Sequence, residues 1–234
     1  LCRTKLYRGL GSASLTGEEA LNLGIKKALI VTDAGVRKAG LLQVVEGSLS
    51  SKKISYAIFD KVPEDADVEP IHQGALLAKL ESCNGVVVVG GGSPICAGKG
   101  IALEATNGGK VRDYAGRNKY KVPPLPVICL PTTAGSGSDV SWTFVIHDSE
   151  LQKIYGVGGN DIQPQVSILD PLLLKTCPPR QMIASGLDAL SHAVEALWTS
   201  KGTPLTDCIA YESTRLIMGN LRAAALTDNM EAKS

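Results

Sequence analysis

Apolar and polar positions alternate along the first two thirds of the chain in a way that predicts strands separated by helices. Four short apolar runs are typical of buried strands: residues 27–33, 54–59, 86–89 and 127–130. Residues 34–44, 72–83 and 94–107 lie between or beside them, and their apolar positions recur with helical spacing. Strands that alternate with helices predict an α/β fold, doubly wound around a mostly parallel sheet.

After Pro178 and Pro179 the pattern changes to long amphipathic helices. A helix predicted at residues 180–199 carries one apolar face, formed by Ile183, Leu187, Leu190, Val194 and Leu197. A second helix is predicted at residues 205–226, with Thr203 as its cap. We therefore expect an α/β domain at residues 1–177 and the first part of an all-helical domain at residues 178–234.

Residues 85–99 (GVVVVGGGSPICAGK) join a buried strand to a helix through three glycines. Ser93 is expected to cap the helix, and Pro94 suits its first position. Backbone N–H groups and the helix dipole would then point at one spot, where an anion such as phosphate can bind. The alternative is a tight turn that needs glycine only for its backbone angles.

Two further polar or small-residue segments follow predicted strands. Asp33 is the last residue of the predicted strand at 27–33, and residues 132–138 (TTAGSGS) follow the strand at 127–130. Ligands of doubly wound sheets bind outside the carboxyl ends of the strands. The sequence therefore predicts that Asp33, the glycines and the TTAGSGS loop share one binding edge.

Asp188 and His192 are four residues apart in the first long helix, so they project from the same face. A carboxylate and an imidazole at that spacing can bind one divalent metal. An ordinary i, i+4 hydrogen bond on a solvated face is the alternative. Glu195 lies on a neighbouring face and would be either a third ligand or a surface charge.

Charge and cysteine usage narrow the function classes. Lys and Arg number 24 against 23 Asp and Glu, and the charges are scattered, which predicts neither nucleic acid nor a membrane surface as a partner. No stretch approaches the ~20 apolar residues of a membrane span. The six cysteines stand far apart without a CxxC pair, as in proteins of a reducing compartment, so we expect a cytoplasmic protein.

Four motifs in order, GGGSPICAGK, PTTAGSGSDV, ILDP and GLDALSHAVEA, resemble those of the iron-dependent (group III) alcohol dehydrogenases. The family's signatures are close to GGGSxxDxxK, PTTAGTGSEV and GMDALTHAVEA, and the resemblance covers essentially the whole chain. It implies an oxidoreductase that transfers a hydride between a small alcohol or aldehyde and a nicotinamide dinucleotide, with a divalent metal polarising the alcohol oxygen. It also implies a homodimer or a larger homo-oligomer.

The family pattern also implies which residues bind the cofactors. The dinucleotide-binding positions would be Asp33, Gly91, Gly92, Ser93, Thr132, Thr133, Ala134, Gly135, Ser136 and Lys153. Asp33 would contact the adenosine ribose and repel a 2′-phosphate, which predicts NAD rather than NADP. Asp188 and His192 would be the first two metal ligands, for iron or alternatively zinc, since an Asp and His set serves both. The pattern implies no separate catalytic residue.

The sequence departs from the family pattern in two places. Cys96 stands where the family has Asp, in a position expected beside the dinucleotide cleft, so cofactor orientation or affinity is in question. The family's other two metal ligands are histidines further downstream, and His72 and His147 match neither of them. We therefore expect a nucleotide domain plus the opening helices of an enzyme, either a fragment or an incomplete gene product, whose activity alone is doubtful.

Two other functions remain open from the sequence. A truncated, catalytically impaired paralogue that still binds the dinucleotide is favoured by Cys96 and by the missing ligands, while the intact GLDALSHAVEA favours an active dehydrogenase. The lyase that makes dehydroquinate shares this architecture, but its metal motifs differ from DALSH.

Overall fold

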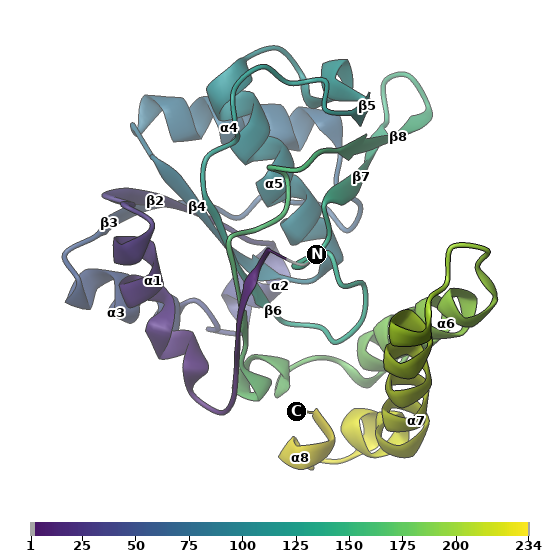
Figure 1. Ribbon diagram of the computed structural model, residues 1–234. Coiled ribbons are helices and arrows are strands. Elements are labelled where there is room, and N and C mark those ends of the chain that lie inside the picture. Colours follow the sequence, from purple (N-terminus) through teal and green to yellow (C-terminus); the bar gives the residue numbers. More distant parts are fainter. Residues whose placement is uncertain (1–2, 234) are drawn as a thin grey trace.

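The computed structural model describes residues 3–233 and contains a six-stranded sheet, in the order β1-β9-β6-β4-β2-β3, in which every neighbouring pair is parallel (Figure 1). Its strands are β1 (Lys5–Arg8), β2 (Lys27–Val31), β3 (Ser55–Phe59), β4 (Gly85–Gly90), β6 (Val127–Pro131) and β9 (Val166–Leu169). The expected doubly wound α/β fold is confirmed. The outermost residues of the predicted domains, 1, 2 and 234, lie outside the described residues.

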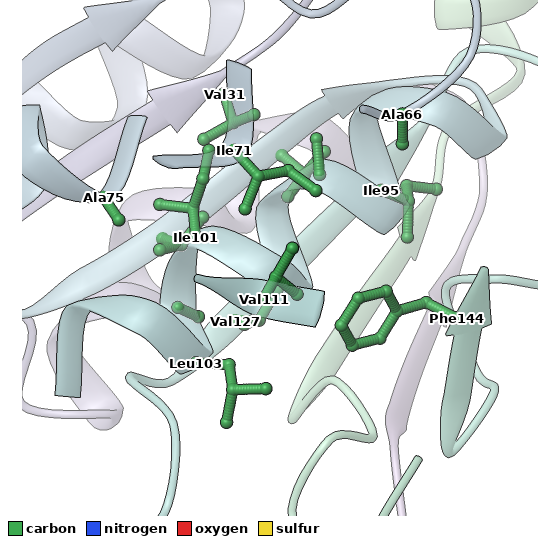
Figure 2. Close-up of a cluster of buried hydrophobic side chains, with 14 of the residues drawn as sticks. Val31, Ala66, Ile71, Ala75, Ile95, Ile101, Leu103, Val111, Val127 and Phe144 are labelled. Atoms are coloured by element: carbon green, nitrogen blue, oxygen red, sulfur yellow. The ribbon is translucent and has the colours of Figure 1, made fainter. Parts of the chain in front are cut away.

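Helices cover both faces of this sheet (Figure 1). The helices α4 (Val68–Leu80) and α5 (Gly92–Asn107) cover one face, and α1 (Thr16–Asn22) and α3 (Gln43–Ser51) cover the other. Val86 and Val88 of β4 point into the cluster drawn in Figure 2, whereas Val87 and Val89 join the cluster on the opposite face. All four valines are 0% exposed, as expected for a central parallel strand whose alternate residues face opposite layers.

Two predicted helices have different bounds in the structure. The helical pattern over residues 34–44 is divided into α2 (Ala34–Lys38) and α3, because Gly40 has a φ of 74° and ends the first helix. Helix α4 begins at Val68, earlier than the predicted residue 72. The Asp67 carboxylate accepts a hydrogen bond from the Val68 N–H, and Pro70 is tolerated because it falls in the first turn.

A second, three-stranded sheet has the order β5-β8-β7. Its strands are β5 (Gly116–Arg117), β7 (Thr143–Asp148) and β8 (Lys153–Gly158), of which β7 and β8 form an antiparallel hairpin. The three strands between residues 143 and 169 are therefore divided between two sheets, since only β9 belongs to the main one.

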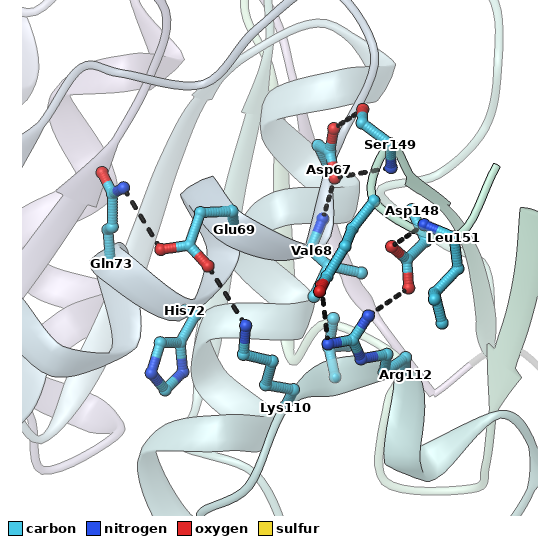
Figure 3. A network of polar contacts seen from close by, with 12 residues as sticks. Asp67, Val68, Glu69, His72, Gln73, Lys110, Arg112, Asp148, Ser149 and Leu151 are labelled. Carbon is cyan, nitrogen blue, oxygen red and sulfur yellow. Dashed lines mark hydrogen bonds and ion pairs between the residues drawn. The ribbon is translucent and has the colours of Figure 1, made fainter. Parts of the chain in front are cut away.

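Polar contacts tie the β7–β8 hairpin to the main domain (Figure 3). Arg112, in the short helix η2 (Val111–Tyr114), donates to Asp148 at 2.8 Å and to Glu150 at 3.0 Å. Burial of the Asp148 carboxyl opposes its ionisation, but the bond from Arg112 lowers its pKa below the usual value. Ser149 donates to the Asp67 carboxylate, so the hairpin also contacts the start of α4.

The chain ends in helices α6 (Pro179–Trp198), α7 (Pro204–Leu226) and α8 (Met230–Lys233), after the short helix η3 (Pro171–Leu174). Thr203 caps α7 as expected. Helices α6 and α7 pack closely where Gly186 faces Leu221, since a Cβ on Gly186 would lie 2.3 Å from a Leu221 methyl carbon. Of the apolar face predicted for α6, Ile183, Leu197 and Leu187 are 38%, 45% and 52% exposed, so α7 does not cover it.

None of the helices within residues 3–233 is long and apolar enough to cross a membrane. Cys83, Cys96, Cys129, Cys177 and Cys208 are free thiols, and Cys2 lies outside the described residues.

Candidate functional site

The strand order creates a crevice between β2 and β4. The chain passes from β2 to β3 on one side and then returns to place β4 on the other side of β2. Helices that follow two strands on either side of such a reversal diverge, and ligands bind in the space between them. Asp33 follows β2 and Gly91 follows β4, so both lie at this crevice, where a cavity of about 500 Å³ opens.

Six of the residues predicted to bind the dinucleotide line this first cavity. They are Asp33, Gly91, Gly92, Ser93, Thr132 and Thr133. Thr32 joins two of the strand ends, because its hydroxyl donates to the Val89 carbonyl at 2.7 Å. The predicted convergence of three separate segments on one edge of the sheet is therefore observed.

Two segments line the same cavity without having been identified from the sequence. One contains Val62, Pro63 and Glu64 after β3, and the other contains Leu173, Thr176, Cys177, Pro178 and Gln181 between η3 and α6. The rule that ligands bind at the carboxyl ends of strands could have identified the first segment, since it follows the strand predicted at 54–59. The second has no local signal, because only the return of the chain after β9 brings it to the crevice.

The N-terminus of α5 forms the floor between the strands. The helix begins at Gly92 with Gly91 as its N-cap, so the predicted capping role of Ser93 is wrong. The Ser93 hydroxyl instead donates to the Glu64 carbonyl, and Pro94 occupies the third helical position, where its missing N–H has no intrahelical partner. The positive end of the α5 dipole and its unpaired first N–H groups lie at the cavity.

Gly91 and Gly92 allow the TTAGSGS loop to approach α5 closely. A Cβ at Gly91 would lie 3.2 Å from Thr133 Oγ1, and a Cβ at Gly92 would lie 3.3 Å from Ser136 Oγ. Both distances are shorter than ordinary van der Waals contact. A side chain at either position would therefore push the TTAGSGS loop by a few tenths of an ångström, whether or not a ligand is bound.

The TTAGSGS loop also lines a second cavity, of about 380 Å³, which shares Gly92 and Thr133 with the first. Ala134, Gly135 and Ser136 contribute to its wall. A Cβ at Gly135 would lie 2.4 Å from the Ser185 carbonyl oxygen, so α6 packs directly on the loop. The first cavity extends from Asp33 to the start of α5, and the second extends from the start of α5 to the part of the loop that packs on α6.

Two positions of interest lie away from these cavities. Lys153 is the first residue of β8, exposed and paired with Asp148 across the hairpin, and it lines neither cavity. Cys96 is half-buried and packs against the core cluster under α5. The expectation that position 96 borders the cleft stays a prediction, and Cys96 lines neither of the two cavities.

Asp188 and His192 lie on one face of α6 with Asp Oδ1 3.9 Å from His Nε2, both about half exposed. Two ligand atoms about 2.1 Å from a tetrahedral ion are about 3.4 Å apart, so this pair would have to close by about 0.5 Å to bind one metal. Within residues 3–233 no three His, Cys, Asp or Glu side chains are grouped to hold a metal. His72 instead pairs with Glu104 at 3.0 Å, and His147 lies 4.0 Å from Asp65.

Two protein-family models match successive parts of the chain. The family model for iron-containing alcohol dehydrogenase matches residues 3–171, and that for the C-terminal part of the Fe-containing alcohol dehydrogenase family matches residues 182–234. Choline dehydrogenase of Bacillus subtilis is 39% identical over 98% of this chain, and NAD-dependent methanol dehydrogenase of Bacillus methanolicus is 39% identical over 96%. The chain spans only 58% and 59% of the lengths of these relatives.

Solved structures agree with these relatives in fold. A 1,3-propanediol oxidoreductase superposes with a TM-score of 0.94 at 38% identity, covering 97% of this chain and 60% of its own. A sulfoacetaldehyde reductase from Bifidobacterium kashiwanohense, solved in complex with NAD+, gives a TM-score of 0.92 at 28% identity, covering 100% of this chain and 62% of its own. This chain therefore belongs to the iron-containing alcohol dehydrogenase family.

Proposed function

We propose that this chain forms the NAD-binding domain and the opening metal-binding helices of an alcohol dehydrogenase, divided near Cys177. The observation that carries the proposal is the cavity at the β2–β4 crevice, where Asp33, Gly91 to Ser93 and Thr132 surround the start of α5. The gap between the two matched family models, from residue 172 to 181, supports the domain division.

The cavity residues suggest how a dinucleotide would lie. The pyrophosphate would sit over Gly91, Gly92 and Ser93, where the helix N-terminus favours negative charge. Asp33 would accept hydrogen bonds from the adenosine ribose in the first cavity, and Ala134 to Ser136 would line the second cavity towards the nicotinamide. The cofactor contact of Lys153 stays a prediction. Its exposed side chain lies in the hairpin, outside both cavities.

Asp188 and His192 would hold two corners of a divalent iron or zinc ion. When bound, such an ion would supply Lewis-acid polarisation of a substrate oxygen. For the whole protein we propose hydride transfer between a small alcohol and its aldehyde, a homo-oligomeric assembly and a cytoplasmic location. Cys96, which replaces the Asp of the family pattern, instead favours a dinucleotide-binding paralogue with impaired catalysis, which is the second candidate function.

Calorimetric titration of the chain with NAD and NADH tests the proposed binding. Gly92→Val should lower the affinity by about 100-fold or more, because the new side chain would occupy the place of the phosphate and press on Ser136. Gly47→Val is the matched control, since a Cβ there meets nothing within 4 Å and Gly47 lines neither cavity. Unchanged affinity in a folded Gly92→Val protein, judged by circular dichroism, would overturn the proposal.

A further inference from the structure

Lys99 is the largest fully buried side chain of the described residues, and apolar packing does not explain why a charged residue is buried there. It lies on α5, is 1% exposed, and its Nζ donates to the Ser141 carbonyl at 2.8 Å and to the Thr143 carbonyl at 3.2 Å. Ser141 and Thr143 mark the end of the segment that carries the TTAGSGS loop into β7. Lys99 thus joins the helix under the phosphate site to the far end of the loop that lines the cavities.

The rest of this loop is held by other bonds. At its start, the Thr132 N–H donates to the Gly90 carbonyl at 3.0 Å. Directly after the loop, the buried Asp139 carboxylate accepts a hydrogen bond from Ser167 of β9 at 2.6 Å. Both of these bonds tie the segment to the main sheet, whereas the two bonds from Lys99 tie its far end to α5. The close approach of Thr133 and Ser136 to Gly91 and Gly92 is a second contact between this loop and the start of α5.

The surroundings of Lys99 are unusual for a buried cation. Burial lowers the pKa of its amine, and the nearby groups that oppose this are the thiols of Cys129 and Cys96 and the carboxyl of Asp139. Asp139 is occupied by Ser167, and across residues 3–233 no carboxylate forms an ion pair with Lys99. An ammonium group has three donors, of which two reach carbonyls.

We propose that Lys99 is a positioning residue that holds the TTAGSGS loop at its distance from α5, and that it does so as a buried amine beside the Cys96 thiol, without a carboxylate partner in residues 3–233. Cys96 precedes Lys99 by three residues on the same helix, so the two side chains share a face. The loop borders mainly the second cavity, while Asp33 borders the first. Lys99 should therefore affect one half of a bound dinucleotide more than the other.

This inference rests on the proposed function. The first experiment distinguishes failure of the positioning role from failure of the proposed dinucleotide binding. Binding of NAD and of AMP is measured by calorimetry for the wild-type chain, Lys99→Met and the exposed-lysine control Lys201→Met. Lys99→Met should weaken NAD binding by about tenfold or more, because bonds from a charged donor are lost, and should leave AMP binding within about twofold. A variant that is merely less stable would weaken both ligands alike, or neither.

The outcomes are distinguishable. If the wild-type chain binds neither ligand, the proposed function fails. If it binds both, and Lys99→Met binds NAD as tightly as the wild type or loses AMP to the same extent, the positioning role is wrong. Lys99→Arg retains the charge and the donors, and should recover most of the NAD affinity lost in Lys99→Met.

A second experiment holds even if Lys99→Met does not fold. Cys96→Asp gives the amine a carboxylate on the same face and should raise the thermal midpoint by about 2–4 °C, with Cys96→Ser as the uncharged control. The half-buried position keeps the desolvation of the new carboxylate small. A midpoint that is unchanged or lower in Cys96→Asp than in Cys96→Ser would contradict the claim that Lys99 lacks a counter-ion.

Discussion

The α/β region and the helical region of this chain bury their apolar residues to very different extents. In the first, Val86 to Val89 are completely buried between two layers of helices. In the second, large apolar side chains of α6 and α7 remain in solvent, including Leu187, Ile209 and Trp198, the last of which is 74% exposed. Both regions have the hydrophobic pattern of their secondary structure, but within residues 3–233 the helical region has only a small buried cluster, formed by Leu174, Met182, Ala224 and Ala225.

The functional sites differ in the same way. The proposed dinucleotide cavity is built from segments of the described chain that converge at the carboxyl ends of β2, β4 and β6. The proposed metal site has two ligands from one turn of α6 and no third within residues 3–233. Binding of the dinucleotide should therefore be a property of this chain, whereas tight metal binding should not.

Paired core and surface truncations test the difference in burial, and carry the largest expected effect. Ile101→Ala should lower the free energy of unfolding by about 2–5 kcal/mol, because Ile101 is fully buried in the cluster of Figure 2 and leaves a cavity. Leu187→Ala should cost less than about 1 kcal/mol, since half of that side chain is already in water. Urea unfolding followed by circular dichroism measures both, and similar losses would contradict the comparison.

Metal analysis tests the difference between the two sites. After gel filtration in metal-free buffer, the 234-residue chain should retain far less than one iron or zinc per chain, because two side chains rarely hold such an ion. His192→Ala should remove the weak binding that remains, and His147→Ala should not. EDTA should leave NAD affinity unchanged within about twofold. A stoichiometric metal that survives filtration would contradict the expectation that Asp188 and His192 alone bind it weakly.

Cofactor preference tests one residue of the α/β region and carries the smallest effect. Asp33→Gly should reduce the preference for NAD over NADP by about tenfold, because a carboxylate repels the 2′-phosphate. Since Asp33 also caps α2 through the Val36 N–H at 2.9 Å, Asp33→Asn is the sharper variant. It removes the charge and keeps a good cap. Equal affinity of the unmodified chain for both cofactors would contradict the assignment.

Local sequence determined the elements of this protein and the place of its binding edge. The run of valines specified a strand buried on both faces, and the glycines and TTAGSGS loop were predicted at strand ends because such signals depend only on neighbours in the chain. Helices α6 and α7 were likewise predicted from their spacing, with bounds within one residue of those observed. The motif resemblance gave the family, since several long motifs in a fixed order are specific.

Tertiary structure decided what those elements meet. The start of α5 at Gly92 and the bond from Ser93 to the Glu64 carbonyl depend on a loop 29 residues earlier in the chain. Cys177 reaches the cavity only because the chain returns after β9, and Lys99 finds its partners 42 and 44 residues further on. A hydrophobic pattern indicates which face of a helix is apolar. Burial of that face requires a partner surface, and the pattern of α6 contains no information about that surface.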